Sequence, residues 1–160
     1  MTKYELIDNF LSEEEFRPIY DIFMGMRIAW NCYDGVVMPG DGKIQFVHPL
    51  YCDFVPSSPY WRDLQPIFDK LDPVAFVRSK ANLNMKTPTH EEHAFHSDVD
   101  DCITSIFYIN TNNGYTEFED GTKIESVENR MLVFNSNSKH RGVTSTDTLK
   151  RVLINFNYFI

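Results

Sequence analysis

Two patterns of apolar and polar residues divide the chain into an N-terminal and a C-terminal part. After Ser12, apolar residues recur at helical spacing, at Phe16, Ile19, Tyr20, Phe23 and Met24. Ser12 and Glu15 have the spacing of a capping box, and Leu11 and Phe16 that of a hydrophobic staple. The pattern therefore predicts a helix that begins after Ser12 and buries one apolar stripe.

A second helical segment is predicted to begin at Ser58-Pro59, because serine caps helices and proline suits their first turn. Its apolar stripe consists of Tyr60, Leu64, Ile67, Phe68 and Leu71. Pro66 interrupts this stretch, so a kinked helix and two short helices are both open. Between the two helical segments, turn signals within residues 27–56 favour a hairpin or long loops.

From residue 76 onward, short runs of β-branched and aromatic residues alternate with turn signals. The predicted strands are residues 103–109, 115–118, 123–127, 131–134 and 151–159. Asn112-Asn113-Gly114 and Asp120-Gly121 mark turns between them. Strands with no helix between them indicate a β-sandwich or jelly roll. We expect one domain over residues 1–160, mostly β, with 1–75 as helical or mixed support and 76–160 as the β core.

Composition narrows the class of protein. With 160 residues, 42% of them hydrophobic, the chain is suited to a packed core, and its net charge of −8 argues against a nucleic-acid partner. No apolar run is long enough for a transmembrane helix and no secretory signal opens the chain, so we expect no membrane partner and a cytoplasmic location. The three cysteines, Cys32, Cys52 and Cys102, are too widely spaced for a CxxC metal site.

The candidate chemistry centres on His96-Ser97-Asp98. Two residues apart on an extended segment, His96 and Asp98 point to one face and are suited to hold one metal ion. His140, which follows a predicted strand and a turn-like segment, is the natural third ligand. Two histidines and one carboxylate on one side of an ion are diagnostic of non-haem Fe(II) oxygenases. Arg151, eleven residues after His140, is a cation suited to a dicarboxylate co-substrate.

With these residues in place, the sequence resembles the 2-oxoglutarate/Fe(II)-dependent dioxygenases, specifically their prolyl-4-hydroxylase-like branch. The matching segments include His96-Ser97-Asp98, residues 102–110, 113–118 and 129–134, His140-Arg141-Gly142-Val143 and Arg151. Residues 6–12 also look like the way such domains begin. The resemblance implies a double-stranded β-helix, that is, a cupin-like jelly roll. It also implies an iron triad of His96, Asp98 and His140, with 2-oxoglutarate as co-substrate.

The resemblance also assigns the co-substrate contacts. Tyr108 and Arg151 match positions that hold the distal carboxylate of 2-oxoglutarate in relatives. Asn84 stands where relatives commonly have a tyrosine, so an amide replaces a phenol there. Family members often carry Gly-Gly at the position of Asn113-Gly114. O₂ is implied as the second co-substrate, and ascorbate is a further candidate cofactor.

Lys150 competes with Arg151, because some relatives use lysine for the same carboxylate. Lys150 shares an apolar face with Val152, Ile154, Phe156 and Tyr158. Arg151 shares a mixed face with Leu153, Asn155 and Asn157. A mixed face suits a ligand-lined interior, and arginine presents a planar fork to a carboxylate. Arg151 is therefore preferred, with Lys150 as the alternative.

His90 and His93 look like additional ligands, but their spacing is not that of HExxH. We interpret their segment as a polar, flexible loop beside the site.

The resemblance implies a dioxygenase that hydroxylates a C–H bond, since halogenating relatives lack the carboxylate that Asp98 supplies. A prolyl residue of a peptide or protein is the first candidate substrate, with amino acids or other small molecules behind it. Two alternatives stay open: a non-catalytic, cupin-like module that binds a metal or small molecule, and a zinc hydrolase, in which Arg151 would have no role.

Overall fold

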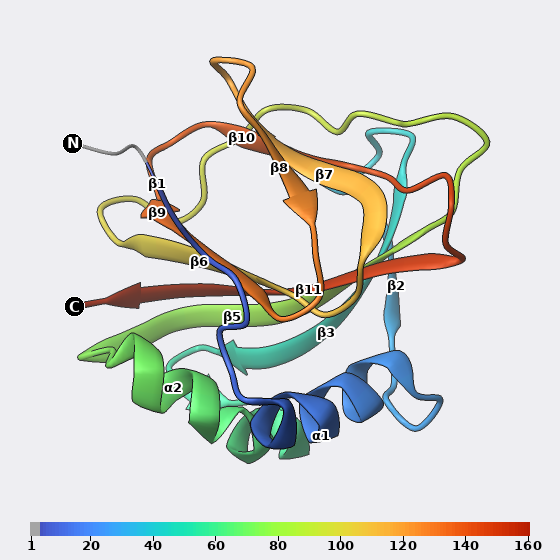
Figure 1. Ribbon diagram of the computed structural model, residues 1–160. Coiled ribbons are helices and arrows are strands. Elements are labelled where there is room, and N and C mark those ends of the chain that lie inside the picture. The colour runs from blue at the N-terminus through green and yellow to red at the C-terminus, as the bar shows by residue number, and fades with distance from the viewer. Residues whose placement is uncertain (1–3) are drawn as a thin grey trace.

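The protein, described by a computed structural model over residues 4–160, consists of two antiparallel β-sheets that face each other (Figure 1). The larger sheet has the order β1 (Tyr4–Ile7), β9 (Arg130–Asn135), β6 (Ile103–Tyr108), β11 (Lys150–Phe159), β5 (Ala75–Met85), β3 (Ile44–Cys52) and β2 (Asn31–Asp34), with β4 (Val55–Pro56) paired to β3. The smaller sheet has the order β10 (His140–Val143), β7 (Asn112–Phe118) and β8 (Lys123–Ser126). The mostly β prediction is confirmed, and the antiparallel sheets are consistent with a jelly roll.

The predicted first helix is present as α1 (Glu13–Met24). The Ser12 hydroxyl accepts the N–H of Glu15, and the Glu15 carboxylate accepts the N–H of Ser12 at 2.9 Å, which completes the capping box. Phe16, Ile19 and Phe23 are buried, as the stripe predicts.

The second helical segment consists of two short helices, one of the two forms that the sequence left open. A 3₁₀-helix, η1 (Pro59–Leu64), is followed directly by α2 (Gln65–Leu71). Ser58 caps η1 by accepting the N–H of Tyr60, and Pro66 lies in the first turn of α2, where it costs no helical hydrogen bond.

Both helical segments pack on the outer face of the larger sheet and form the main core with it (Figure 1). Phe156 of β11 lies in an aromatic cluster with Phe68 of α2 and Phe76 of β5, at ring-centroid distances of 6.2 and 6.3 Å. The helices therefore cover the outer face of the larger sheet. On its inner face, a second apolar cluster that includes Leu132 and Phe134 packs against Phe118 of the smaller sheet, and the remaining part can line a site.

Several strands differ from the sequence prediction, among them β10 (His140–Val143), which no signal in the sequence predicted. β1 was not predicted, and it pairs with β9, a strand more than a hundred residues away along the chain. The turn predicted at Asn112-Asn113-Gly114 belongs to β7, where the pairing with β8 is irregular between Asn112 and Tyr115. The Asp120-Gly121 turn is confirmed: it joins β7 to β8, and Gly121 has a φ of 85°.

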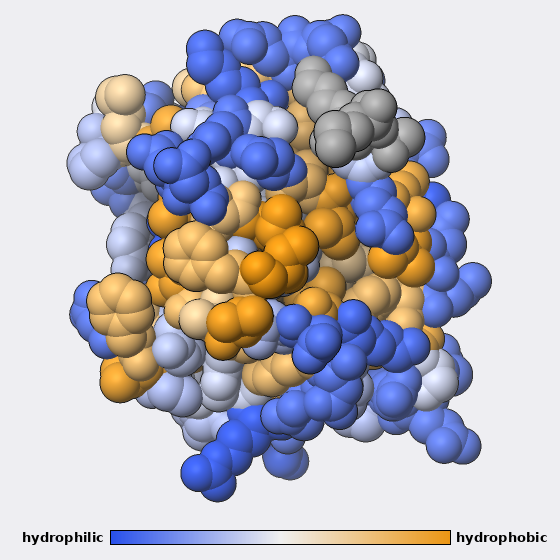
Figure 2. Space-filling view, turned by 90° about the vertical axis from the view of Figure 1, so that its left-hand side faces the viewer, coloured by the Kyte–Doolittle hydropathy of each residue, from blue (hydrophilic) through white to orange (hydrophobic). Residues whose placement is uncertain are grey.

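Apolar side chains also reach the surface. The side on which the C-terminus lies shows hydrophobic side chains gathered near its middle, with hydrophilic ones around them (Figure 2). Phe159 and Ile160, at the end of β11, are exposed. Within residues 4–160, no helix combines the length and the apolar character needed to cross a membrane.

Candidate metal centre

His96, Asp98 and His140 come together at a pocket between the two sheets. His96 and His140 form an isolated β-bridge, in which each backbone N–H donates to the carbonyl oxygen of the other, at 3.0 and 2.9 Å. One ligand atom from each of the three side chains lies within 4.8 Å of the other two. This spacing brings residue 140 to the 96/98 pair and lets the three side chains hold a single metal ion.

Hydrogen bonds orient both imidazoles toward a common point. The Nδ1 of His96 lies 3.2 Å from the Ala94 carbonyl oxygen, and the Nδ1 of His140 lies 3.1 Å from that of Ser138. A carbonyl oxygen only accepts, so each Nδ1 carries the proton and donates it. These hydrogen bonds occupy Nδ1 and leave Nε2 as the ring nitrogen that is available to bind a metal.

The Asp98 carboxylate is buried and held by one oxygen. Its Oδ2 accepts hydrogen bonds from Thr104, Asn155 and Asn157, at 3.1, 3.0 and 3.2 Å. Burial by itself would raise the pKa of Asp98, but His140, the two amides and Arg78 outweigh it, so the pKa lies below its ordinary value. Asp98 is therefore ionised at neutral pH, with Oδ1 facing the histidines.

Burial also lowers the pKa of His140. Its imidazole is therefore neutral at pH 7, which is the form that binds metals.

Arg151 lies in the same pocket, fully buried at the start of β11. Its Nε donates to the Ser126 hydroxyl at 3.0 Å and its Nη2 to the Thr116 hydroxyl at 3.3 Å. No carboxylate among residues 4–160 forms an ion pair with it, and burial lowers its pKa. A buried guanidinium that is hydrogen-bonded to hydroxyls and lies over the Tyr108 ring is well suited to receive a carboxylate from a ligand.

Gly114 makes room for this arginine. A Cβ at position 114 would lie 2.7 Å from Cδ of Arg151 and 2.8 Å from the carbonyl oxygen of Val143. Any larger residue would clash with backbone on one side and with the arginine stem on the other. The Asn113-Gly114 pair thus keeps a glycine at the position where space is required.

The structure separates Lys150 from Arg151, as strand alternation predicted. Lys150 points toward α1, where its Nζ donates to the Met24 carbonyl oxygen at 2.7 Å. Arg151 points into the pocket. Lys150, the alternative to Arg151, therefore lies on the outer face of the sheet, away from the pocket.

The resemblance assigns Tyr108 to the distal carboxylate of 2-oxoglutarate, and the structure shows its contacts. Tyr108 is buried, it does not line the pocket, and its hydroxyl donates to Thr116 at 2.7 Å. Thr116 lines the pocket in its place and also accepts from Arg151. Tyr108 therefore orients the hydroxyl that contacts the arginine.

Asn84 does line the pocket. It pairs with Arg151 across β5 and β11, and its Nδ2 is buried without a hydrogen-bond partner in the described part of the chain. A buried amide donor that lacks a partner is costly unless a ligand accepts from it.

The pocket is small, about 60 Å³, and most of its lining is polar. Six polar lining residues were not predicted as site residues: Gln45, Lys80, Asn82, His93, Thr116 and Asn155. For Lys80, Asn82 and Asn155 the signal was strand alternation. Polar residues recur at every second position from Arg78 to Asn84 and, apart from Leu153, from Arg151 to Asn157. The aliphatic residues Ile106 and Leu153 cover part of the wall.

His93 is not part of a flexible loop, as its sequence context suggested. It is buried, and its backbone N–H donates to the Gly142 carbonyl oxygen at 3.0 Å, which ties the segment to β10. Burial, followed by Arg151 and Lys43, lowers the pKa of His93 to about 4. The structure therefore places a neutral imidazole in the pocket wall.

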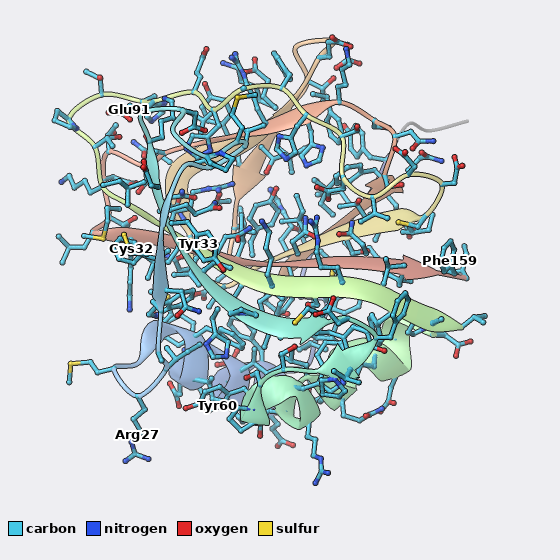
Figure 3. All side chains as sticks on the ribbon, turned by 180° about the vertical axis from the view of Figure 1, so that it is seen from behind. Arg27, Cys32, Tyr33, Tyr60, Glu91 and Phe159 are labelled. Carbon is cyan, nitrogen blue, oxygen red and sulfur yellow. The ribbon has the colours of Figure 1, made fainter. Side chains whose placement is uncertain are left out.

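The β2–β3 hairpin forms one rim of the pocket. Val36 lines the pocket, and the backbone N–H groups of Val36 and Val37 both donate to Asp41 at 3.0 Å. Lys43 lies 3.9 Å from Glu91, in the segment between β5 and β6. Figure 3 shows Glu91 above Cys32 and Tyr33, which lie on the edge strand β2.

Sequence comparison alone assigns no family. No protein-family model matches the chain, and no curated protein matches it.

Solved structures share its fold. A prolyl hydroxylase from Trichoplax adhaerens, in complex with a hypoxia inducible factor peptide fragment, is 13% identical, with a TM-score of 0.65, covering 99% of this chain and 84% of that one. A Pseudomonas putida prolyl-4-hydroxylase is 14% identical, with a TM-score of 0.59 and coverage of 99% and 93%. The alpha-ketoglutarate-dependent epimerase SnoN from nogalamycin biosynthesis is 12% identical, with a TM-score of 0.70 and coverage of 98% and 76%. At the level of the fold, these similarities confirm the resemblance to the 2-oxoglutarate/Fe(II) oxygenases, prolyl hydroxylases included.

Proposed function

We propose that this protein is an Fe(II)- and 2-oxoglutarate-dependent dioxygenase that hydroxylates a C–H bond, within one domain of residues 1–160. One observation carries the proposal. Two imidazoles and a carboxylate converge at a pocket that also contains a buried guanidinium with no carboxylate partner among residues 4–160. A metal ion and a dicarboxylate are the ligands that this pair of features fits.

His96, Asp98 and His140 are the proposed iron ligands. The Nε2 atoms of the two histidines and Oδ1 of Asp98, whose hydrogen bonds go to its other oxygen, suit a facial triad, which leaves coordination positions open for co-substrates. Bound Fe(II), with O₂ and 2-oxoglutarate, supplies the oxidising chemistry of such sites. Ascorbate as a reductant of the iron is part of the proposal, as is O₂.

Arg151 is the proposed anchor for the distal carboxylate of 2-oxoglutarate. Thr116 contributes its hydroxyl beside the guanidinium, and Tyr108 holds that hydroxyl in place. The unpartnered Nδ2 of Asn84 is a donor for the same co-substrate. Buried, pre-oriented donors of this kind position a ligand without further ordering of side chains.

The reaction balances with 2-oxoglutarate as the two-electron reductant of O₂. One oxygen atom enters succinate as CO₂ leaves, and the other enters the C–H bond of the substrate as a hydroxyl group. Asp98 favours hydroxylation over halogenation, because it occupies the position that a halide would need. A prolyl residue of a peptide is one candidate substrate, and the peptide held by the Trichoplax neighbour supports it.

The test is iron-dependent conversion of 2-oxoglutarate to succinate. We expect Fe(II) and 2-oxoglutarate to give a metal-to-ligand charge-transfer band without O₂, and succinate once O₂ is admitted. His96→Ala should abolish both, whereas His90→Ala, which changes an exposed histidine outside the pocket, should leave both in place.

Other outcomes would identify the alternatives. Tight metal binding with no 2-oxoglutarate band and no succinate would favour the binding module. Hydrolytic activity with Zn²⁺ and without O₂ would favour the zinc hydrolase.

A further inference from the structure

Lys80 is a cation of the pocket that the proposed function does not use. It lies on the inner face of β5, is half-buried, and lines the same pocket as Asp98 and Asn155. Within residues 4–160 its ammonium group has no ion pair closer than 4 Å and no hydrogen bond. Burial lowers its pKa, Arg78 adds to the effect, and Asp98 opposes it.

The neighbouring charged groups have partners within the chain. Arg78 donates to Asn157 at 3.1 Å and lies 3.6 Å from Asp98, while Lys43 lies 3.9 Å from Glu91. His93 is neutral, because its pKa is about 4. In the proposed complex, the positive charges of Fe(II) and Arg151 are matched by Asp98 and the two carboxylates of 2-oxoglutarate. Among the described residues near the pocket, Arg78 and Lys80 then remain without a counter-charge of their own, and of these two only Lys80 lines the pocket.

Two hydrogen-bond acceptors near Lys80 also have no partner. Oδ1 of Asn82 and Oδ1 of Asn155 are buried and unpaired in the described part of the chain. Asn155 pairs with Lys80 across β5 and β11, and Asn82 is the next inward-facing residue of β5. Buried acceptors without donors are costly, so they point to N–H groups on a ligand.

We infer that the organic substrate is of the amino-acid type, with a free carboxylate that binds Lys80 and an adjacent N–H group that donates to Asn82 or Asn155. The inference rests on the proposed function and specifies its substrate class. A free amino acid and the C-terminal residue of a peptide both have this chemistry.

The position of Lys80 argues against a role in holding the distal end of 2-oxoglutarate. Lys80 pairs with Asn155 and Asn84 with Arg151, so four residues, roughly 13 Å of strand, separate the two cations along the sheet. Lys80 therefore lies at the Asp98 end of the pocket and Arg151 at the other.

The test compares acids with their amides. The probes are the free L-amino acids, the matching L-amino acid amides, and glycyl dipeptides with free C-termini, which separate a free amino acid from a peptide terminus. Stimulation of 2-oxoglutarate turnover is measured in the wild-type protein, in Lys80→Met and in Lys80→Arg. Lys86→Met, which changes an exposed lysine just beyond β5, is the matched control.

We expect at least one acid to act at about 10-fold lower concentration than its amide. That preference should disappear in Lys80→Met, persist largely in Lys80→Arg and be unaffected in Lys86→Met. Equal responses to acids and amides, no response to any probe, or a preference that survives in Lys80→Met would overturn the inference. So would a Lys80→Met protein whose main defect is a higher 2-oxoglutarate requirement.

Calorimetric titration of the metal-free protein with the same pairs needs no turnover, so it separates failure of this inference from failure of the proposed function. The acid preference should be lost in Lys80→Met and kept in Arg151→Met. Loss only in Arg151→Met would place the carboxylate at the other end of the pocket and contradict the inference.

Discussion

The two faces of strand β11 differ: one packs against the helices and the other lines the pocket. Its outward residues, Val152, Ile154, Phe156 and Tyr158, are buried against the helices. Its inward residues include Arg151, Leu153 and Asn155, which line the pocket, and Asn157, which binds Asp98. Both faces are equally buried, but one is apolar and the other mostly polar. Burial on the outer face stabilises the fold, whereas burial on the inner face prepares polar groups for ligands.

Strand β5 repeats this division. Ala81 and Leu83 face the helices, while Lys80, Asn82 and Asn84 face the pocket. The unpartnered side-chain atoms on these two strands all belong to the inner face. Substitutions on the two faces should therefore have separable effects, on stability for the outer face and on ligand binding for the inner one.

The largest effect is expected on the outer face, for Phe156→Ala. Phe156 is fully buried between β11, α2 and β5, so its truncation leaves a cavity and should cost about 3–5 kcal/mol of unfolding free energy. Denaturant unfolding measures this cost. Phe159→Ala, at the exposed end of the same strand, is the matched control and should cost far less. Equal costs would contradict the assignment of Phe156 to the core.

The pH dependence of the unfolding free energy tests whether His93 in the pocket wall is buried. Its pKa is about 4 in the fold and 6.5 when unfolded, so the unfolded chain binds the proton more tightly. Stability should therefore fall as pH drops from 6.5 to about 4, by roughly 3 kcal/mol relative to His93→Gln.

Denaturant unfolding at several pH values gives the difference between the two proteins. His90→Gln, at an exposed histidine, is the control and should leave the curve unchanged. Parallel curves for the wild type and His93→Gln would show that His93 is solvated.

Arg151→Met removes the buried cation of the inner face. We expect the 2-oxoglutarate concentration needed for half-maximal turnover to rise about 10- to 100-fold, because a charge-assisted pair is lost. The unfolding free energy should stay the same or rise, since a buried charge without a carboxylate partner is itself costly. An unchanged 2-oxoglutarate requirement would refute the assignment of Arg151.

The smallest effect is expected for Lys150→Met, one residue away on the opposite face. It removes the hydrogen bond from Lys150 to the Met24 carbonyl oxygen and should cost about 1 kcal/mol of unfolding free energy. The 2-oxoglutarate requirement should not change. A shift comparable to that of Arg151→Met would mean that the two faces are not independent.

Local signals in the sequence predicted a large part of this structure. The capping box of Ser12 and Glu15 predicted where α1 begins, because capping depends on residues within one turn. Alternation along residues 150–158 correctly separated Lys150 from Arg151, because side-chain direction in a strand follows position alone. The His96-Ser97-Asp98 spacing identified two members of the cluster for the same reason.

Features that depend on distant partners were missed or misplaced. β1 carries no strong strand signal, and its pairing with β9 comes from the sheet edge that β9 offers. His93 looked like a loop residue, because nothing near it in sequence reveals that β10 covers it. The role of Tyr108 at the co-substrate stays a prediction, but its hydrogen bond to Thr116 of β7, in the other sheet, had no signal in the sequence.

The sequence by itself determined which residues alternate between the faces of β5 and β11, where α1 begins, and which side chains are suited to bind a metal. Only the tertiary structure decided that residue 140 reaches residues 96 and 98, that Gly114 leaves space for Arg151, and that Lys80 forms no ion pair within residues 4–160. Periodicity is set by covalent geometry within a few residues. Convergence, burial and missing partners depend on how two sheets pack, which no short segment encodes.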